Sequence, residues 1–261
     1  MDRRTVMAQL AALAAGAGQF LPGAAQAHPG AETLARPRVA MLVHPKMVLL
    51  DHVPAHTAFA LAMCDIDLVW KAYEPVTTDL GVTVSPTRTF EEVSGPLDVL
   101  YVPGGLGGTM ACMEDEAVIG FLQRAGKTAG LVTSVCTGSL LLGAAGLLKG
   151  YRATGHWHSC ELLPLLGATL ERERIVVDRN RITGGGVTAG LDFGLEVASR
   201  LRGEEWAKSI QLVLEYAPRP PFEAGTPVGA GPGVVGLADR MLRPQLEKAR
   251  AVAERVGRGL A

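Results

Sequence analysis

Short apolar runs alternate with helix-like segments throughout residues 38–222 of this chain. The runs at 38–43 and 99–102 are typical of strands buried on both faces, whereas 54–64 and 114–128 carry apolar residues at helical spacing. Strands and helices that alternate in this way form a mostly parallel sheet with helices on both faces. The sequence therefore predicts a doubly wound α/β fold, with any ligand bound beyond the carboxyl ends of the strands.

The remaining elements follow the same alternation. We expect further strands at 66–73, 82–84 and 131–135, a hairpin of 175–177 with 181–183, and helices at 139–148, from 189 past 201, and at 206–216. Gly203 is expected to separate the last two helices. A Gly- and Pro-rich connection then extends to Gly236. The final helix, with a narrow apolar stripe over 242–256, should pack on the domain or on a second subunit.

The composition indicates one sizeable domain with a small ligand. The chain has 261 residues, 48% of them hydrophobic, which is enough to bury a large core without disulfides or a structural metal. A formal net charge of -1 argues against a nucleic-acid partner, which would require a clustered basic excess, and against a strongly charged polymer. We therefore expect a small-molecule substrate that is largely uncharged.

Residues 1–27 have the pattern of a cleavable leader. Arg3-Arg4 precedes a mildly apolar stretch, and Ala25-Gln26-Ala27 resembles a cleavage site, so we expect twin-arginine export to the periplasm. The alternative is an N-terminal extension without a targeting role. We expect no membrane span in the mature chain, an α/β domain over 28–225, and a linker with a terminal helix over 226–261. Export would put the four cysteines, Cys64, Cys112, Cys136 and Cys160, in a compartment that permits disulfides, but their spacing predicts no pairing.

The segment Ser134-Val135-Cys136-Thr137-Gly138 joins an expected strand to an expected helix. Small residues at Ser134 and Gly138 permit a sharp turn that exposes the side chain between them, as in a nucleophile elbow. Cys136 would then lie at the amino end of a helix, where the partial positive charge favours a thiolate. The alternative is a cysteine buried as a small hydrophobic residue.

Two further strand ends could face Cys136. Gly104 and Gly105 follow the 99–102 strand, and their amides, with that of Thr137, could stabilise an anion near the sulfur; alternatively they form only a turn. We expect Asp51 to close a strand region before a helix, where a carboxylate could also serve as an N-cap. A buried carboxyl beside a thiolate would hold its proton more tightly, which suits a general acid.

The histidines leave several alternatives open. His156, expected on a strand, could pair with Cys136 as a base or an orienting group. His52 and His56, with His156, His158 or Cys160, could be imagined as a metal site, but no third ligand stands in register, so we predict no metal.

These stretches together resemble the ThiJ/PfpI superfamily, relatives of the class I glutamine amidotransferase domain, and within it the isonitrile hydratase branch. The resemblance covers nearly all of residues 38–225. It rests on several motifs in order: Ser134–Ser139, Ala144–Leu148 with Gly150–Thr154, His156-Trp157, Gly186–Asp192, and Gln211-Leu212 with Glu215-Tyr216 and Pro220–Phe222.

The resemblance implies a flavodoxin-like domain, a nucleophile at Cys136, an acid at Asp51 and Thr137 beside the nucleophile. It also implies a homodimer, no cofactor, and hydration of an isonitrile to an N-substituted formamide. Where the family usually has Gly-Pro and then Glu after the acid, this chain has Pro54-Ala55 and Thr57. We expect this difference to alter the pocket wall near Asp51.

Two alternative functions remain open from the sequence. One is a glyoxalase or deglycase acting on reactive carbonyls, since those relatives keep an acid, a cysteine and a histidine at positions 51, 136 and 156. The other is a non-enzymatic ligand-binding domain or thiol sensor, because an accessible cysteine of low pKa oxidises readily. The same fold is often joined to a DNA-binding helix-turn-helix, but the residues after Pro221 are too few for that module.

Overall fold

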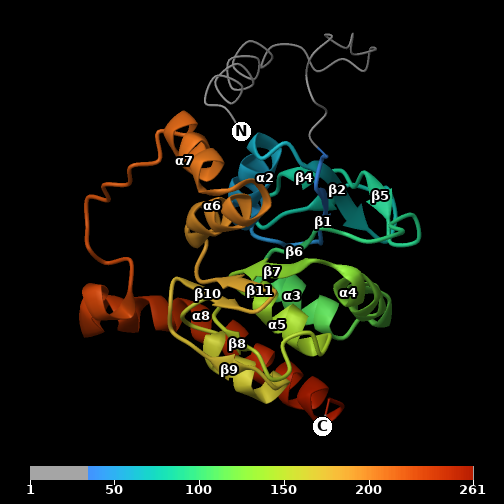
Figure 1. Ribbon diagram of the computed structural model, residues 1–261. Coiled ribbons are helices and arrows are strands. Elements are labelled where there is room, and N and C mark those ends of the chain that lie inside the picture. The colour runs from blue at the N-terminus through green and yellow to red at the C-terminus, as the bar shows by residue number, and fades with distance from the viewer. Residues whose placement is uncertain (1–34, 261) are drawn as a thin grey trace, which may run out of the picture. The chain divides into compact units, whose positions relative to one another are not determined.

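A seven-stranded sheet forms the centre of the protein in the computed structural model, which describes residues 35–260 (Figure 1). The strand order is β10-β11-β7-β6-β1-β2-β5. The strands are β1 (Arg38–Leu42), β2 (Asp65–Trp70), β5 (Arg88–Thr89), β6 (Val99–Val102), β7 (Leu131–Val135), β10 (Ile175–Asp178) and β11 (Arg181–Gly184). All neighbouring strands pair in parallel except β10 and β11. The predicted mostly parallel α/β fold is therefore confirmed.

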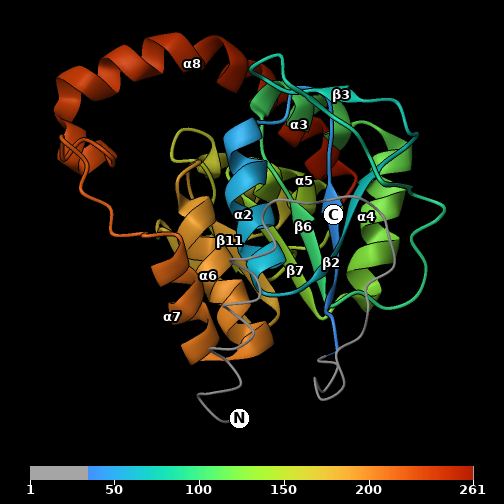
Figure 2. The ribbon, with the colours of Figure 1, turned by 90° about the horizontal axis from the view of Figure 1, so that it is seen from above.

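Helices cover both faces of the sheet (Figures 1 and 2). One face carries α2 (Leu49–Leu61), α6 (Ala189–Arg202) and α7 (Glu204–Val213). The other carries α3 (Leu106–Met113), α4 (Glu116–Thr128), α5 (Gly138–Ala144), the 3-10 helix η1 (Cys160–Leu166) and part of α8 (Pro227–Arg258). Two small ribbons complete the fold: β3 (Val76–Thr77) with β4 (Thr83–Val84), and β8 (Arg152–Ala153) with β9 (Thr169–Leu170).

Strand β6 shows how the two apolar layers arise. All four of its side chains are buried, and alternate residues point to opposite faces. Leu100 joins the large core beneath α3, α4 and α5, whereas Tyr101 packs on the other face against Phe59 of α2 and Phe193 of α6, with ring centroids 5.9 and 5.5 Å away. This burial on both faces explains why the strand reads as a continuous apolar run.

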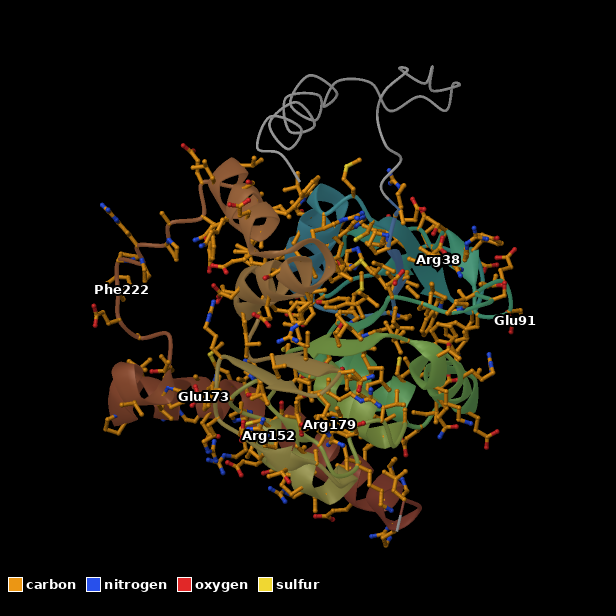
Figure 3. The ribbon with its side chains drawn as sticks, viewed as in Figure 1. Arg38, Glu91, Arg152, Glu173, Arg179 and Phe222 are labelled. Carbon is orange, nitrogen blue, oxygen red and sulfur yellow. The ribbon has the colours of Figure 1, made fainter. Side chains whose placement is uncertain are left out.

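The predicted hairpin and the predicted helix break are both present. Strands β10 and β11 pair in antiparallel register across a two-residue turn, in which Arg179 has a positive φ of 56°. The guanidinium of Arg179 lies 3.5 Å from the centre of the Tyr151 ring. Arg152, which is labelled beside Arg179 in Figure 3, forms an ion pair with Glu171. Gly203, with φ 89° and ψ 162°, separates α6 from α7.

Several expected boundaries are wrong. The residues Val48 to Asp51 do not close a strand, because α2 begins at Leu49 and Pro54 lies inside it rather than in its first turn. The expected helix at 114–128 is present as α4, which begins two residues later, at Glu116. Helix α3, which precedes it, was not predicted because its Gly-rich start resembles a turn. His156 lies on no strand, since β8 ends at Ala153 and turns follow.

The C-terminal connection is also shorter than expected. Helix α8 begins at Pro227 rather than beyond Gly236, because the Thr226 side chain caps it by accepting from the Gly229 N–H at 3.1 Å. Its Gly and Pro residues are accommodated by a kink, in which Gly231 adopts φ 73°. The second half packs on the domain, as predicted, with Ala249 and Val252 in the core. Among the described residues, no helix is both long and apolar enough to cross a bilayer. The predicted leader lies outside the described residues.

Candidate active site

Three neighbouring strands bring the candidate residues to one edge of the sheet. In the order β7-β6-β1, Cys136 follows β7, Gly104 follows β6, and Asp51 lies beyond β1 in the first turn of α2. The chain runs from β1 to β2 on one side of β1 and returns to β6 on its other side. The crevice between β1 and β6 is therefore the topological switch point, where α/β sheets bind their ligands.

Cys136 occupies a strained turn between β7 and α5. Its φ of 60° is unusual for a residue with a side chain. The turn is held by the Cys136 N–H, which lies 3.1 and 2.8 Å from the carbonyl oxygens of Gly184 and Gly185. A Cβ at Gly138 would come within 2.2 Å of the Val102 carbonyl oxygen, so the chain needs glycine there. This geometry has the form of the predicted nucleophile elbow.

Asp51 is fully buried in the first turn of α2. One oxygen, Oδ2, accepts the N–H of Gly104 at 2.9 Å, and the Cys136 side chain lies close to the carboxyl on the other side of Gly104. The other oxygen, Oδ1, has no hydrogen-bond partner within residues 35–260. Asp51 does not cap its own helix: Asp79 does so, since its Oδ1 accepts the Leu49 N–H at 2.9 Å. Oδ1 of Asp51 is therefore available to bond with a reactant or to exchange a proton with it.

The protonation states of Asp51 and Cys136 depend on each other. Burial raises the pKa of Asp51 to about 7, against the lowering effect of the Gly104 N–H. Burial and the neighbouring Asp51 carboxylate raise the pKa of Cys136 well above its ordinary value, although the Thr137 N–H favours the thiolate. The expectation that the helix amino end would make Cys136 a resting thiolate is therefore not met. Because both groups disfavour full ionisation, the pair retains at least one proton at neutral pH.

Gly104 and Gly105 do not offer the free amides that we expected. The Gly104 N–H donates to Asp51, and the Gly105 N–H donates to Thr137 Oγ1 at 2.9 Å. Thr137 Oγ1 also hydrogen-bonds with Thr109 Oγ1 at 2.9 Å. The glycines instead permit close approach: a Cβ at Gly104 would lie 2.6 Å from the Thr137 nitrogen and 2.7 Å from Asp51 Oδ2. Thr137 thus links the turn after β6 to the elbow.

His156 lies beside Cys136 without a described bond from its ring to the thiol. Its backbone N–H donates to the Cys136 carbonyl at 3.3 Å, and its Nδ1 accepts the His158 N–H at 3.4 Å. Burial lowers the pKa of His156, which keeps its ring neutral at pH 7. Within residues 35–260 the contacts support a role for His156 in shaping the elbow rather than as a base.

The other histidines and cysteines lie apart from this site. His52 and His56 contact each other on α2, with 3.3 Å between ring nitrogens, but neither lines the pocket over Cys136. Within the described part of the chain, no group of three or more His, Cys, Asp or Glu side chains is arranged to hold a metal. The remaining cysteines, Cys64, Cys112 and Cys160, are buried and unpaired.

A pocket of about 690 Å³ opens over Cys136. It is lined by Pro45, Lys46, Val48, Thr77, Thr78, Asp79, Gly81, Gly105, Leu106, Gly107, Cys136, Thr137, His156, His158, Ser159, Val187, Leu242 and Gln245. Sequence reasoning missed the walls from 45–48, 77–81 and α8, because only tertiary packing brings them to the strand ends. Pro54, Ala55 and Thr57 do not line it, so the expectation that they alter its wall is wrong.

Comparison with known proteins agrees with this fold. The sequence profile of the DJ-1/PfpI family matches residues 37–200. An isonitrile hydratase of Pseudomonas putida is 45% identical over 219 residues, which cover 84% of this chain and 95% of that protein. Protein DJ-1alpha of Drosophila melanogaster is 31% identical over 149 residues, covering 56% of this chain and 69% of that protein.

A solved structure extends the similarity to three dimensions. The crystal structure of a ThiJ/PfpI family protein from Pseudomonas syringae superposes with a TM-score of 0.82 at 41% identity, covering 89% of this chain and 98% of that one. The family profile, the sequence identity and the structural similarity thus lead to one assignment. This chain belongs to the DJ-1/PfpI family, also called ThiJ/PfpI.

Proposed function

We propose that the protein hydrates isonitriles to N-substituted formamides, with Cys136 as the nucleophile and Asp51 as the group that carries protons. The observation that supports this most strongly is the buried Asp51 carboxyl, which touches the Cys136 thiol and has a pKa raised to about 7. A group with a pKa near neutrality can both accept and release a proton during one turnover. The similarity to a protein named isonitrile hydratase supports the choice of substrate.

The first half of the reaction adds the thiol across the isonitrile carbon. Asp51 as carboxylate takes the proton from the Cys136 thiol as the sulfur forms a bond to the terminal carbon. The same carboxyl then delivers that proton to the carbon, which completes a C–H bond. The product is a thioimidate, in which the carbon bears one hydrogen, is singly bonded to sulfur and is doubly bonded to nitrogen. Asp51 ends this half as a carboxylate.

The second half consumes one water molecule. Asp51 accepts a proton from the water as the water oxygen adds to the thioimidate carbon, and it passes that proton to the substrate nitrogen, which becomes N–H. Asp51 then takes the hydroxyl proton as the C=O bond forms and the C–S bond breaks, and it returns this proton to the sulfur. The sum is one isonitrile plus one water giving one N-substituted formamide, with both protein groups restored.

The surroundings fit this chemistry. Isonitriles are small and uncharged, and a pocket of about 690 Å³ can hold one with an organic substituent and a water molecule. Val48, Leu106, Val187 and Leu242 offer apolar contacts for the substituent. Asp51 itself has no exposed surface, so its proton is directed to the thiol and to a bound reactant rather than to bulk water.

The direct test is to incubate the purified protein with a panel of isonitriles and to quantify the corresponding formamides by mass spectrometry. We expect formamide from the wild type and none above background from Cys136→Ser. Absence of formamide from the whole panel, with Cys136 shown to be reduced, would overturn the proposal. Lactate from methylglyoxal would instead indicate carbonyl chemistry, and a reversible Cys136 sulfenate without turnover would indicate a sensor.

We also propose that the working form is a homodimer, on the ground of the family resemblance. Light scattering coupled to size-exclusion chromatography tests this. A mass of one chain at micromolar concentration would contradict it.

A further inference from the structure

Helix α8 supplies one wall of the pocket although it lies outside the residues matched by the family profile. Leu242 and Gln245 line the cavity that also contains Cys136. They are three residues apart, so they lie on one face of the helix. The substituent of any molecule held against Cys136 in this cavity therefore shares its space with this face of α8.

The second half of α8 is firmly fixed to the protein. Ala249, Val252 and Ala253 are buried in the main core, and α8 contacts η1, α3 and α5. Arg255 forms an ion pair with Glu114 at the end of α3. The face that buries these residues continues toward the amino end of the helix through Leu246 and Leu242. Core packing therefore sets the angle at which the helix passes the pocket.

The first half of α8 reaches the protein through a different contact. His158 Nε2 and Asp239 Oδ1 are 2.9 Å apart, and the His158 side chain is buried while it also lines the pocket. The opposite side of this half is exposed, with Leu237 and Met241 at 55% and 74% exposure. Figure 2 shows this half extending away from α6 and α7. The Asp239 contact thus joins the pocket wall to the start of the helix.

We propose that the face of α8 formed by Leu242 and Gln245 limits the size of the substituent that the pocket accepts, and that the contact between His158 and Asp239 positions this face. This inference rests on the proposed isonitrile hydration for its substrate class. Leu242 and Gln245 are specificity-determining residues, and Asp239 is a positioning residue, because it touches the pocket only through His158.

The first experiment measures kcat/KM for methyl isonitrile and for cyclohexyl isonitrile with the wild type, Leu242→Ala, Leu242→Trp and Gln245→Ala. We expect both alanine variants to raise the cyclohexyl-to-methyl ratio, by about tenfold for Leu242→Ala, and Leu242→Trp to lower it by a similar factor. Met241→Ala is the matched control, since Met241 is exposed and does not line the pocket. If the Leu242 and Gln245 variants gave the same cyclohexyl-to-methyl ratio of kcat/KM as the wild type and Met241→Ala, the inference would be overturned.

A second readout does not depend on hydration. Alkylation of Cys136 by iodoacetamide and by its bulkier N-benzyl derivative, followed by intact-mass spectrometry, reports the size limit even if no isonitrile is hydrated. The same variants should shift the ratio of the two alkylation rates in the same directions. Normal thermal unfolding of each variant establishes that it is folded. An unchanged alkylation ratio in all variants would contradict the inference, whether or not the proposed function holds.

The positioning contact is tested with a pair of variants. Asp239→Ala removes the bond to His158 and also an ion pair with Arg243, whereas Arg243→Ala removes only the latter. We expect Asp239→Ala to raise the cyclohexyl-to-methyl ratio and the amide exchange rate of 232–242, and Arg243→Ala to leave the ratio unchanged. If Asp239→Ala and Arg243→Ala changed the cyclohexyl-to-methyl ratio equally, the positioning role of Asp239 would be overturned.

Discussion

Asp51, in the first turn of α2, and Cys136, in the turn after β7, lie next to each other across Gly104, which follows the intervening strand β6. The charge of the carboxyl acts on the adjacent thiol, and Gly104 donates its N–H to the same carboxyl. This relationship makes the proton of the pair available at the place where a substrate carbon would meet the sulfur.

Replacing the acid should stop proton transfer while keeping the shape of the site. Asp51→Asn retains size but cannot accept or release the proton, so we expect kcat for isonitrile hydration to fall by about 10²- to 10⁴-fold. Steady-state kinetics with the preferred isonitrile provides the measurement. Glu204→Gln, an exposed carboxyl change on α7 outside the pocket, is the control. An Asp51→Asn variant with wild-type kcat would exclude Asp51 from the reaction.

The raised pKa of Asp51 predicts the pH dependence of activity. Below its pKa of about 7 both Asp51 and Cys136 are protonated, so no base is present to activate the thiol. The value of kcat/KM should therefore rise as the pH rises through about 7 and then level off. Asp51→Asn should lose this rise in whatever activity remains. A profile that falls through the same range would contradict the proton relay.

The raised pKa of Asp51 also predicts how the free energy of unfolding varies with pH. The carboxyl has an ordinary pKa of 3.8 and a folded value of about 7, so between these values the folded chain binds more protons than the unfolded one. The free energy of unfolding should then fall as pH rises from about 4 to 7, by on the order of 4 kcal/mol from this group. Urea unfolding at pH 5 and pH 8 tests this, since Asp51→Asn should gain stability relative to the wild type at pH 8.

Asp79 should influence the acid without touching it. Its Oδ1 caps the first turn of α2, and its charge contributes to raising the pKa of Asp51. Asp79→Asn keeps a capping oxygen and removes the charge, so it should move the rise of the pH profile to lower pH at low ionic strength. Asp79→Ala should also cost about 1 kcal/mol of stability through the lost cap. Identical pH profiles for the wild type and both variants would show that the charge has no influence.

Gly104 should not tolerate a side chain. A Cβ there would lie 2.7 Å from Asp51 Oδ2 and 2.8 Å from Cys136 Cβ, so Gly104→Ala must push the acid and the thiol apart. We expect about a hundredfold loss of kcat or more and a stability loss of about 1–3 kcal/mol. Gly120→Ala is the control, because a Cβ there meets only the end of the Arg124 side chain. Wild-type kinetics in Gly104→Ala would contradict the close contact.

Much of this site was predictable from local patterns. The elbow at Cys136 was evident because the small residues Ser134 and Gly138 flank it between a strand and a helix. Asp51 was placed opposite Cys136 although its local structure was assigned wrongly. That error did not change its position, because the loop after β1 and the first turn of α2 both lie at the carboxyl end of β1, beside the crevice.

The features of the site that the sequence did not predict depend on tertiary packing. Whether the Gly104 and Gly105 amides were free could not be read from the sequence, because their acceptors, Asp51 and Thr137, come from distant segments. The resting thiol was missed for the same reason, since burial and the nearby carboxylate outweigh the helix end. The α8 wall was missed although a helix over 242–256 was predicted, because the sequence does not show that Leu242 and Gln245 pack over the strand ends.

The most direct test of the account is to trap the first intermediate on Cys136. Rapid quenching of the wild type with cyclohexyl isonitrile, followed by peptide mass spectrometry, should show the peptide that contains Cys136 heavier by the mass of one isonitrile. The adduct should disappear as N-cyclohexylformamide forms, and it should be absent from Cys136→Ser. Formation of the formamide at an undiminished rate by Cys136→Ser would contradict the account.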